Sequence, residues 1–172
     1  RLCPGRNPRH HQEDITKSRD QSWLGRRTNM SKVTAEESPD NFYDAVGGAP
    51  TFAKLTARFY EGVASDPEFR AMYPEEDLGP AEERLRMFLE QYWGGPNTYQ
   101  QQRGHPRLRM RHAPFVITVA ERDTWLRHMK TALDELQLPS RYSDEMWEYF
   151  VHAADAMVNT LQTPQPRPGS AL

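Results

Sequence analysis

The residues best suited to chemistry lie in one short stretch, GHPRLRMRHAPF, at positions 104–115. On a short helix, Leu108 and His112 share a face because they are four residues apart, and Phe115 follows three residues later. The neighbouring cations point elsewhere on such a helix. The spacing therefore predicts an imidazole that faces an apolar interior, with guanidinium groups around its mouth: Arg107, Arg109 and Arg111.

A metal ion held by side chains alone would need more ligands than this segment offers. No second His, Cys or carboxylate lies at ligand spacing from His112. A haem needs only one imidazole from the protein, and its two propionates need cations at the rim of the pocket. The arginine-flanked His112 suits that demand. The residues alone nevertheless favour the alternative, a structural histidine beside a surface basic cluster.

The apolar faces of the chain are compatible with a planar cofactor. Flat or flexible side chains dominate them, and such faces pack either an ordinary core or a macrocycle. They are Phe59, Phe88, Trp93, Phe115, Trp125 and Met129. Tyr60 and Tyr73 lie in or beside apolar stripes, so their hydroxyls need partners when buried.

The other histidines are weaker candidates for a ligand. His10 and His11 lie in a polar tail, where a metal role would be unspecific. His152 falls on the exposed side of its predicted helix, and His128 lies at the edge of an apolar face. We interpret His128 as a satisfied rim or core residue.

Composition limits the class of protein and its partners. The 172 residues carry a formal net charge of -2, which gives no global reason to expect nucleic acid or an acidic membrane as partner. No run approaches the ~18 apolar residues of a membrane span. The only cysteine, Cys3, has no partner for a disulfide or a zinc site, so we expect a reducing, cytoplasmic setting.

The chain is expected to hold one folded domain at 41–162 between two tails. Residues 1–40 read as a disordered polar tail, and 163–172 as a disordered proline-rich tail. Residues 1–29 hold seven Lys or Arg and three Asp or Glu, a local excess of seven minus three, or +4. Met30 is the expected natural start, so mass spectrometry of the native protein should find no peptides from 1–29.

The periodicity predicts an all-α fold, since apolar residues recur at three and four and no strand alternation is present. Residues 97–105 have no period and read as a loop. The expected helices and their boundaries are a short turn capped by Asp40, a helix from Pro50, one from Asp66-Pro67 to about Tyr73, one from Pro80 to Gly94, a brief one between Pro106 and Pro114, one with the capping box Thr118–Glu121, and one capped by Ser143. Inward positions of the last three long helices include Tyr92, Val119 and Leu161.

Residues 42–159 resemble the truncated haemoglobins, specifically group II. The resemblance rests on the combination of FYDAVGGAPTF, ARFYEGVASDP, MYPEEDLGPAEERLRMFLEQYWGGP, RGHPRLRMRHAPF and TWLRHM. It implies a truncated globin fold, in which two antiparallel helix pairs sandwich a haem b. It also implies a reduced first helix and a mostly extended loop before the proximal histidine.

The resemblance carries roles onto individual positions. His112 matches the proximal iron ligand, and Ala81 stands where ordinary globins keep a distal histidine, with Leu85 one turn later. The matching distal hydrogen-bond donors are Tyr60, Tyr73 and Trp125. The expected cofactor contacts are completed by Phe88, Phe115, Met129, the propionate partners Arg109 and Arg111, and the weaker candidates Tyr99 and His105.

These residues predict reversible binding of dioxygen and other diatomic ligands. Donors aimed at the partly negative ligand would slow its release, which favours scavenging or redox work over delivery. The first alternative is a redox haem enzyme, a nitric oxide dioxygenase or a peroxidase-like protein, that depends on a separate reductase. The rival from another class is a haem-free helical interaction module whose arginine run 103–111 binds phosphate or nucleic acid. The sequence leaves a homo-oligomer open.

Overall fold

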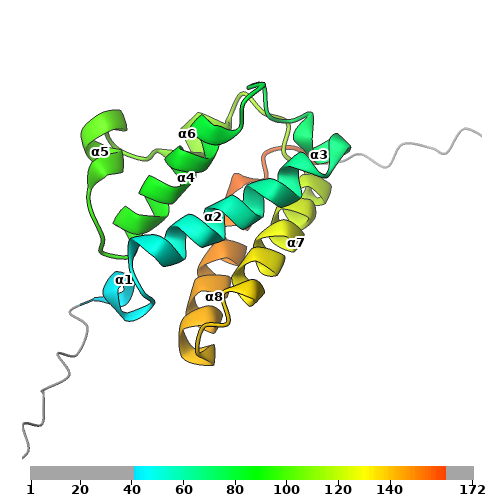
Figure 1. The fold of residues 1–172 in the computed structure, drawn as a ribbon. Coiled ribbons are helices and arrows are strands. Elements are labelled where there is room, and N and C mark those ends of the chain that lie inside the picture. Colours follow the sequence, from blue (N-terminus) through cyan, green and yellow to red (C-terminus); the bar gives the residue numbers. More distant parts are fainter. Residues whose placement is uncertain (1–40, 162–172) are drawn as a thin grey trace, which may run out of the picture. The chain divides into compact units, whose positions relative to one another are not determined.

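The computed structural model describes residues 41–161, and Figure 1 shows these residues as an arrangement of helices. No strand occurs in this part of the chain, which confirms the all-α prediction. The predicted tails, Asp40 and Met30 lie outside the described residues. The helices are α1 (Phe42–Ala45), α2 (Ala49–Ala64), α3 (Pro67–Arg70), α4 (Gly79–Tyr92), α5 (Thr98–Arg103), α6 (Leu108–His112), α7 (Val119–Glu135) and α8 (Ser140–Met157).

The four long helices form two pairs. One pair is α2 with α4, and the other is α7 with α8, while α2 also packs on α7 and so joins the two (Figure 1). The short helices are attached at the edges, since α5 packs on α4 and α6 packs on α8. This is the two-on-two arrangement of helices that the sequence predicts.

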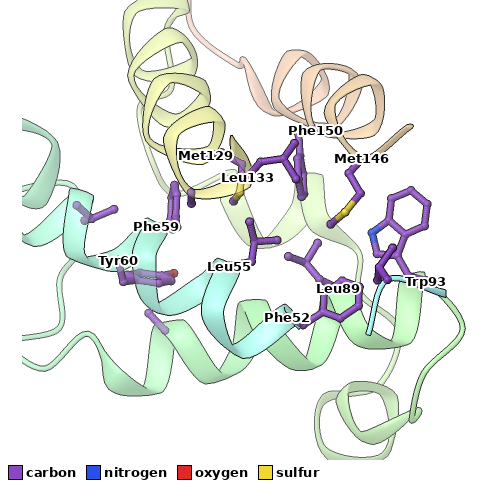
Figure 2. Packing of buried hydrophobic residues seen from close by; sticks show 14 of the residues in the cluster. Phe52, Leu55, Phe59, Tyr60, Leu89, Trp93, Met129, Leu133, Met146 and Phe150 are labelled. Carbon is purple, nitrogen blue, oxygen red and sulfur yellow. The ribbon is translucent and has the colours of Figure 1, made fainter. Parts of the chain in front are cut away.

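The core between the pairs is built from the apolar stripe of α2. Phe52, Leu55 and Phe59 recur at three and four residues and are fully buried. Figure 2 shows Leu55 and Phe59 near Met129 and Leu133 of α7, and Phe52 beside Leu89 of α4. Burying a side chain of this size contributes about 1.5–3 kcal/mol, so the stripe fixes how α2 crosses its neighbours.

Local signals set most helix ends as predicted. Thr118 and Glu121 form the expected capping box: the Thr118 amide donates to Glu121 Oε2 at 2.8 Å, and the Thr118 hydroxyl accepts from the Ala120 amide at 3.1 Å. Gly47 and Gly48 have φ values of 104° and 64°, a region that glycine enters at little cost. They turn the chain sharply between α1 and α2.

Three helix boundaries differ from the prediction. The cap of α1 is Asn41 and not Asp40, because the Asn41 Oδ1 atom accepts from the Asp44 amide at 2.9 Å. The helix that begins at Pro67 ends at Arg70 and not near Tyr73, because the Arg70 guanidinium donates to the carbonyl oxygens of Tyr73, Glu75 and Glu76 and holds them in a turn. The last helix begins at Ser140 and not at Ser143. The carbonyl of Pro139 accepts from the amides of Tyr142 and Ser143, so the helix starts one turn earlier.

The prediction of a loop over 97–105 was wrong for Thr98–Arg103, which form α5. The helix is anchored by Tyr99, which is buried with its ring 5.6 Å from that of Phe88. A helix of six residues presents only one such apolar position, so no period was visible in the sequence. Three positions predicted to face inward are exposed: Tyr92, Val119 and Leu161.

Candidate functional site

A cavity of about 680 Å³ lies among the helices. Residues of α2, α4, α6, α7 and α8 line it, together with the corner after α3. Its walls are mainly apolar, with Leu85, Phe88, Phe150 and Ala154 among them. The cavity is large enough for a ligand of drug or cofactor size.

His112 enters this cavity from α6, at the place where the sequence predicts a ligand. Its Nδ1 atom lies 2.7 Å from the carbonyl oxygen of Leu108, one turn earlier on the same helix. A carbonyl oxygen can only accept, so the proton resides on Nδ1 and donates to it. The Nε2 atom is then left with a free lone pair, which is the form of imidazole that binds a metal.

Arg111 also lines the cavity, and its guanidinium is held by the preceding segment. Its Nε donates to the carbonyl of Pro106 at 2.8 Å and its Nη2 donates to the carbonyl of Arg103 at 2.8 Å. Arg111 therefore ties the end of α5 to α6 and keeps a positive charge at the cavity. Of the other rim candidates, Arg109 and His105 are exposed and do not line the cavity.

The predicted distal residues all line the cavity. They are Tyr60 of α2, Tyr73 after α3, Ala81 and Leu85 of α4, and Trp125 of α7. The rings of Tyr60 and Tyr73 stand edge to face with centroids 5.8 Å apart. Helix α2, the segment after α3 and helix α7 thus contribute two phenols and an indole to the wall of the same cavity.

The electrostatics of the two phenols follow from burial. Burial is the main cause that raises the pKa of Tyr60 and of Tyr73 well above the ordinary value. Both groups therefore remain protonated at neutral pH, and each keeps a hydroxyl hydrogen that it can donate.

Trp125 is positioned by packing on both of its sides. Its ring centroid lies 5.3 Å from that of Phe59 and 5.9 Å from that of Phe150. Phe59 belongs to α2 and Phe150 to α8, so the indole packs against a residue of each helix pair. Among the remaining predicted contacts, Phe88, Tyr99 and Phe115 line the cavity, whereas Met129 is fully buried in the core and does not.

The structure adds charged residues that sequence reasoning missed. Arg84 lines the cavity and pairs with Glu75 at 2.6 Å, and this ion pair holds the pKa of Glu75 below its ordinary value. Arg122 lines it too, with a 2.7 Å ion pair to Asp155 of α8. The sequence did contain a signal for Arg84. It lies three residues after Ala81, so the two side chains are neighbours on the same face of α4.

Two of the histidines set aside by the sequence, His128 and His152, do not line the cavity, whereas His10 and His11 lie outside the described residues. His128 Nε2 is 2.9 Å from Asp66 Oδ2, which confirms a satisfied rim residue, and His152 is exposed. Residues 41–161 hold no cluster of three or more His, Cys, Asp or Glu side chains able to bind a metal ion. No helix in the same range is long and apolar enough to cross a membrane.

The site thus defines a class of protein. A single imidazole with a free Nε2, an apolar cavity and cations at its edge fit a haem, which needs one protein ligand and rim partners for its propionates. The two-on-two helices around this cavity are those of a shortened globin.

Comparison with known proteins gives the same answer. The chain belongs to the bacterial-like globin family, whose model matches residues 41–159. The Group 2 truncated hemoglobin YjbI of Bacillus subtilis (strain 168) is 38% identical over 117 residues, which are 68% of this chain and 87% of that protein. The chain is accordingly a group II truncated haemoglobin, and its cofactor is a haem iron.

Solved structures support the fold at high identity. A thermostable haemoglobin from the actinobacterium Thermobifida fusca is 63% identical with a TM-score of 0.69, covering 73% of this chain and 99% of that one. A truncated oxygen-avid haemoglobin from Bacillus subtilis is 38% identical with a TM-score of 0.66, covering 70% of this chain and 100% of that one. The two-on-two prediction is confirmed.

Proposed function

We propose that this protein reversibly binds dioxygen and other diatomic ligands at a haem iron held by His112. The observation that carries the proposal is that one cavity joins the free Nε2 of His112 to three hydrogen-bond donors, Tyr60, Tyr73 and Trp125. The relative from Bacillus subtilis that is described as oxygen-avid supports it. When bound, the haem iron supplies an open coordination position for the diatomic ligand.

On the proximal side, one turn of α6 orients a single imidazole. The bond from Nδ1 to the Leu108 carbonyl fixes the tautomer and the ring orientation, and it makes Nε2 a better donor to the metal. Pro114 lies in the cavity wall directly after α6 and ends the helix. His112 would therefore be presented to the iron in advance of cofactor binding.

Of the two predicted propionate partners, Arg111 lines the cavity and Arg109 does not. Arg103 is a further cation at the cavity wall. The hydrogen bonds from Arg111 to Pro106 and Arg103 leave its Nη1 free of protein partners in the described region. We include Arg84 as a third candidate because it lines the same cavity. Each would hold a carboxylate by a charge-assisted hydrogen bond.

On the distal side, small Ala81 leaves room and donates nothing, so the phenols and the indole take over ligand stabilisation. Tyr60 and Tyr73 both line the cavity and stay protonated, so each phenol offers a hydroxyl hydrogen there. Trp125 offers its indole N–H from the opposite helix pair. A net hydrogen bond contributes about 1 kcal/mol, so two or three donors together slow ligand release by roughly 10–100-fold.

Slow release suits a scavenging or redox task better than delivery. Turnover of nitric oxide or peroxide is the second candidate function, favoured by the number of donors on the distal side. Such turnover consumes electrons, and residues 41–161 carry only the globin fold. A separate reductase would have to supply the electrons.

The test is reconstitution of the full chain with haemin, followed by reduction and equilibration with dioxygen. We expect a Soret band, and a reversible spectral change when the gas is added and removed. The haem-free interaction module predicts no Soret band at all. A protein that takes up haem but shows no reversible change with dioxygen would contradict the proposed function while leaving the cofactor in place.

A further inference from the structure

One surface of the protein is charged with a single sign. Residues 91–120 contain four arginines and no aspartate or glutamate. All four arginines are exposed, and none pairs with a carboxylate within residues 41–161. We call this the basic surface, formed by Arg103, Arg107, Arg109 and Arg111.

Within residues 41–161 no ion pair neutralises the basic surface, and Arg107 and Arg109 do not line the cavity and so stand apart from the proposed propionate partners. The helix that packs on α6 is α8, and Asp155 near its end is already paired with Arg122 at 2.7 Å. By contrast, six ion pairs elsewhere on the described chain join an Arg or Lys to a carboxylate of the same helix or of a second helix. One example is Arg58 of α2 with Glu135 of α7 at 2.8 Å. The basic surface therefore creates a local positive potential on a chain whose net charge is -2.

The basic surface surrounds the edge of the cavity. Two of its members, Arg103 and Arg111, also line the cavity wall. The neighbouring Met110 lines the wall as well. Met110 lies between Arg109 and Arg111 in the sequence and is 67% exposed, so a large apolar side chain adjoins the cations. An apolar centre within a charged rim is the composition of a protein–protein interface.

Part of this charge is held in place. Arg111 donates to three carbonyls of the preceding loop, so its guanidinium cannot move freely. Arg107 has a φ of 42°, a left-handed conformation, and its amide donates to His105 Nδ1 at 3.2 Å. Preorganised charges steer a partner with less loss of side-chain entropy than mobile ones.

We propose that the basic surface docks an acidic one-electron redox protein, which reduces the haem iron of this globin. The proposal rests on the proposed function and names its electron donor by chemical class, an acidic iron–sulfur or flavin carrier. One electron leaves the carrier's reduced centre, and the ferric haem iron gains it and becomes ferrous. No bond forms or breaks in this step, and the carrier leaves oxidised by one electron.

A protein fits the basic surface better than a nucleic acid or a membrane. Binding to a phosphate backbone needs many cation contacts and gains nothing from exposed Met110. Position adds a second reason, because a carrier seated here would approach the edge of the cofactor cavity.

The test uses haem-loaded full-length protein and an acidic flavodoxin as probe. Arg107→Asn removes a charge with a residue that tolerates the left-handed conformation, and Arg107→Glu reverses it. Lys54→Gln and Lys54→Glu are matched controls, since Lys54 is exposed on α2 far along the chain from the basic surface and makes no ion pair within residues 41–161. Soret spectra check that every variant retains haem.

Two readouts are taken. Equilibrium binding of labelled, oxidised flavodoxin is followed by fluorescence anisotropy, and reduction of the ferric protein by reduced flavodoxin is followed by stopped flow. At low salt we expect Arg107→Glu to weaken binding and slow reduction by about tenfold, with Arg107→Asn between it and wild type. Raising the salt to the ~0.1 M range, where the Debye length is about 10 Å, should erase much of the difference.

The Lys54 variants should change neither readout by more than about twofold. Equal effects of the Arg107 and Lys54 series would overturn the proposal, as would a wild-type reduction rate that does not fall with salt. Weaker binding of duplex DNA or anionic vesicles in Arg107→Glu, without any change toward flavodoxin, would also overturn it. These outcomes are independent of dioxygen binding, because the anisotropy measurement uses oxidised proteins without dioxygen as a reactant.

Discussion

The Nδ1 atom of His112 donates to the carbonyl oxygen of Leu108 across 2.7 Å, within a single turn of α6. This contact decides which ring nitrogen can bind a metal, because it occupies Nδ1 and leaves Nε2 with its lone pair. The short helix therefore does more than position the histidine. It selects the tautomer that a haem iron requires.

The first prediction concerns this ligand. His112→Gly should lose most of the Soret absorbance after reconstitution and gel filtration, because no other side chain in the cavity wall is an imidazole. Adding free imidazole should restore it, since the small ligand fills the space that the side chain vacates. His152→Gly, on the exposed face of α8, is the control and should behave as wild type. Full haem retention by His112→Gly without imidazole would contradict the assignment.

The second prediction concerns Arg111. Arg111→Met keeps the aliphatic stem but removes the hydrogen bonds to the carbonyls of Pro106 and Arg103. The segment between α5 and α6 should then open more often, so amide exchange at Gly104 and Arg107 should rise by roughly tenfold. Hydrogen exchange mass spectrometry of the haem-loaded protein measures this.

Arg109→Met is the matched control for Arg111→Met, because Arg109 is equally exposed and lies on the same short helix without lining the cavity. If both variants raise exchange equally, the effect belongs to general loss of charge. If neither does, the bonds of Arg111 do not hold the segment.

The third prediction is a pH dependence that arises at Asp66. Its carboxylate accepts from His128 at 2.9 Å and from the Phe69 amide at 3.2 Å. The hydrogen bond from His128 is the main cause that holds the pKa of Asp66 below its ordinary value of 3.8. A lowered folded-state pKa means that the stabilisation is complete above 3.8 and is lost as the pH falls through the lower folded value.

Asp66→Asn tests this, because asparagine keeps the cap of α3 but cannot lose a proton. Urea unfolding at about pH 5 should show wild type more stable than the variant. The difference should shrink below about pH 4, where wild-type Asp66 takes up its proton. A difference that persists unchanged at pH 3 would mean that the carboxylate charge is not the cause.

Much of the fold could be predicted from the sequence because its long helices carry regular apolar stripes. The stripe Phe52, Leu55 and Phe59 predicted α2, and the Thr118–Glu121 box predicted where α7 begins. Short elements were less accessible. Helix α5 depends on one buried ring, Tyr99, and the end of α3 depends on Arg70 reaching carbonyls beyond the helix.

The candidate site shows the same limit. His112 was found because its spacing from Leu108 and its arginine neighbours are local in the sequence. The resemblance, and not periodicity, supplied the distal set of Tyr60, Tyr73 and Trp125, which come from separate elements. Arg84 and Arg122 were missed because their position at the cavity depends on how α4 and α7 pack, and Met129 was included although the packing buries it elsewhere.

The central claim is that His112 binds the haem while Tyr60, Tyr73 and Trp125 retain the ligand by hydrogen bonds. The most direct measurement is the dioxygen dissociation rate, followed by stopped-flow displacement with carbon monoxide. The rate should rise by about fivefold to tenfold in Tyr73→Phe and in Trp125→Phe, and further in the double variant. Tyr60→Phe should raise the rate as well, because Tyr60 lines the same cavity and its ring stands edge to face with that of Tyr73 at 5.8 Å. Dissociation rates equal to wild type in Tyr73→Phe, Trp125→Phe and their double variant would contradict the account.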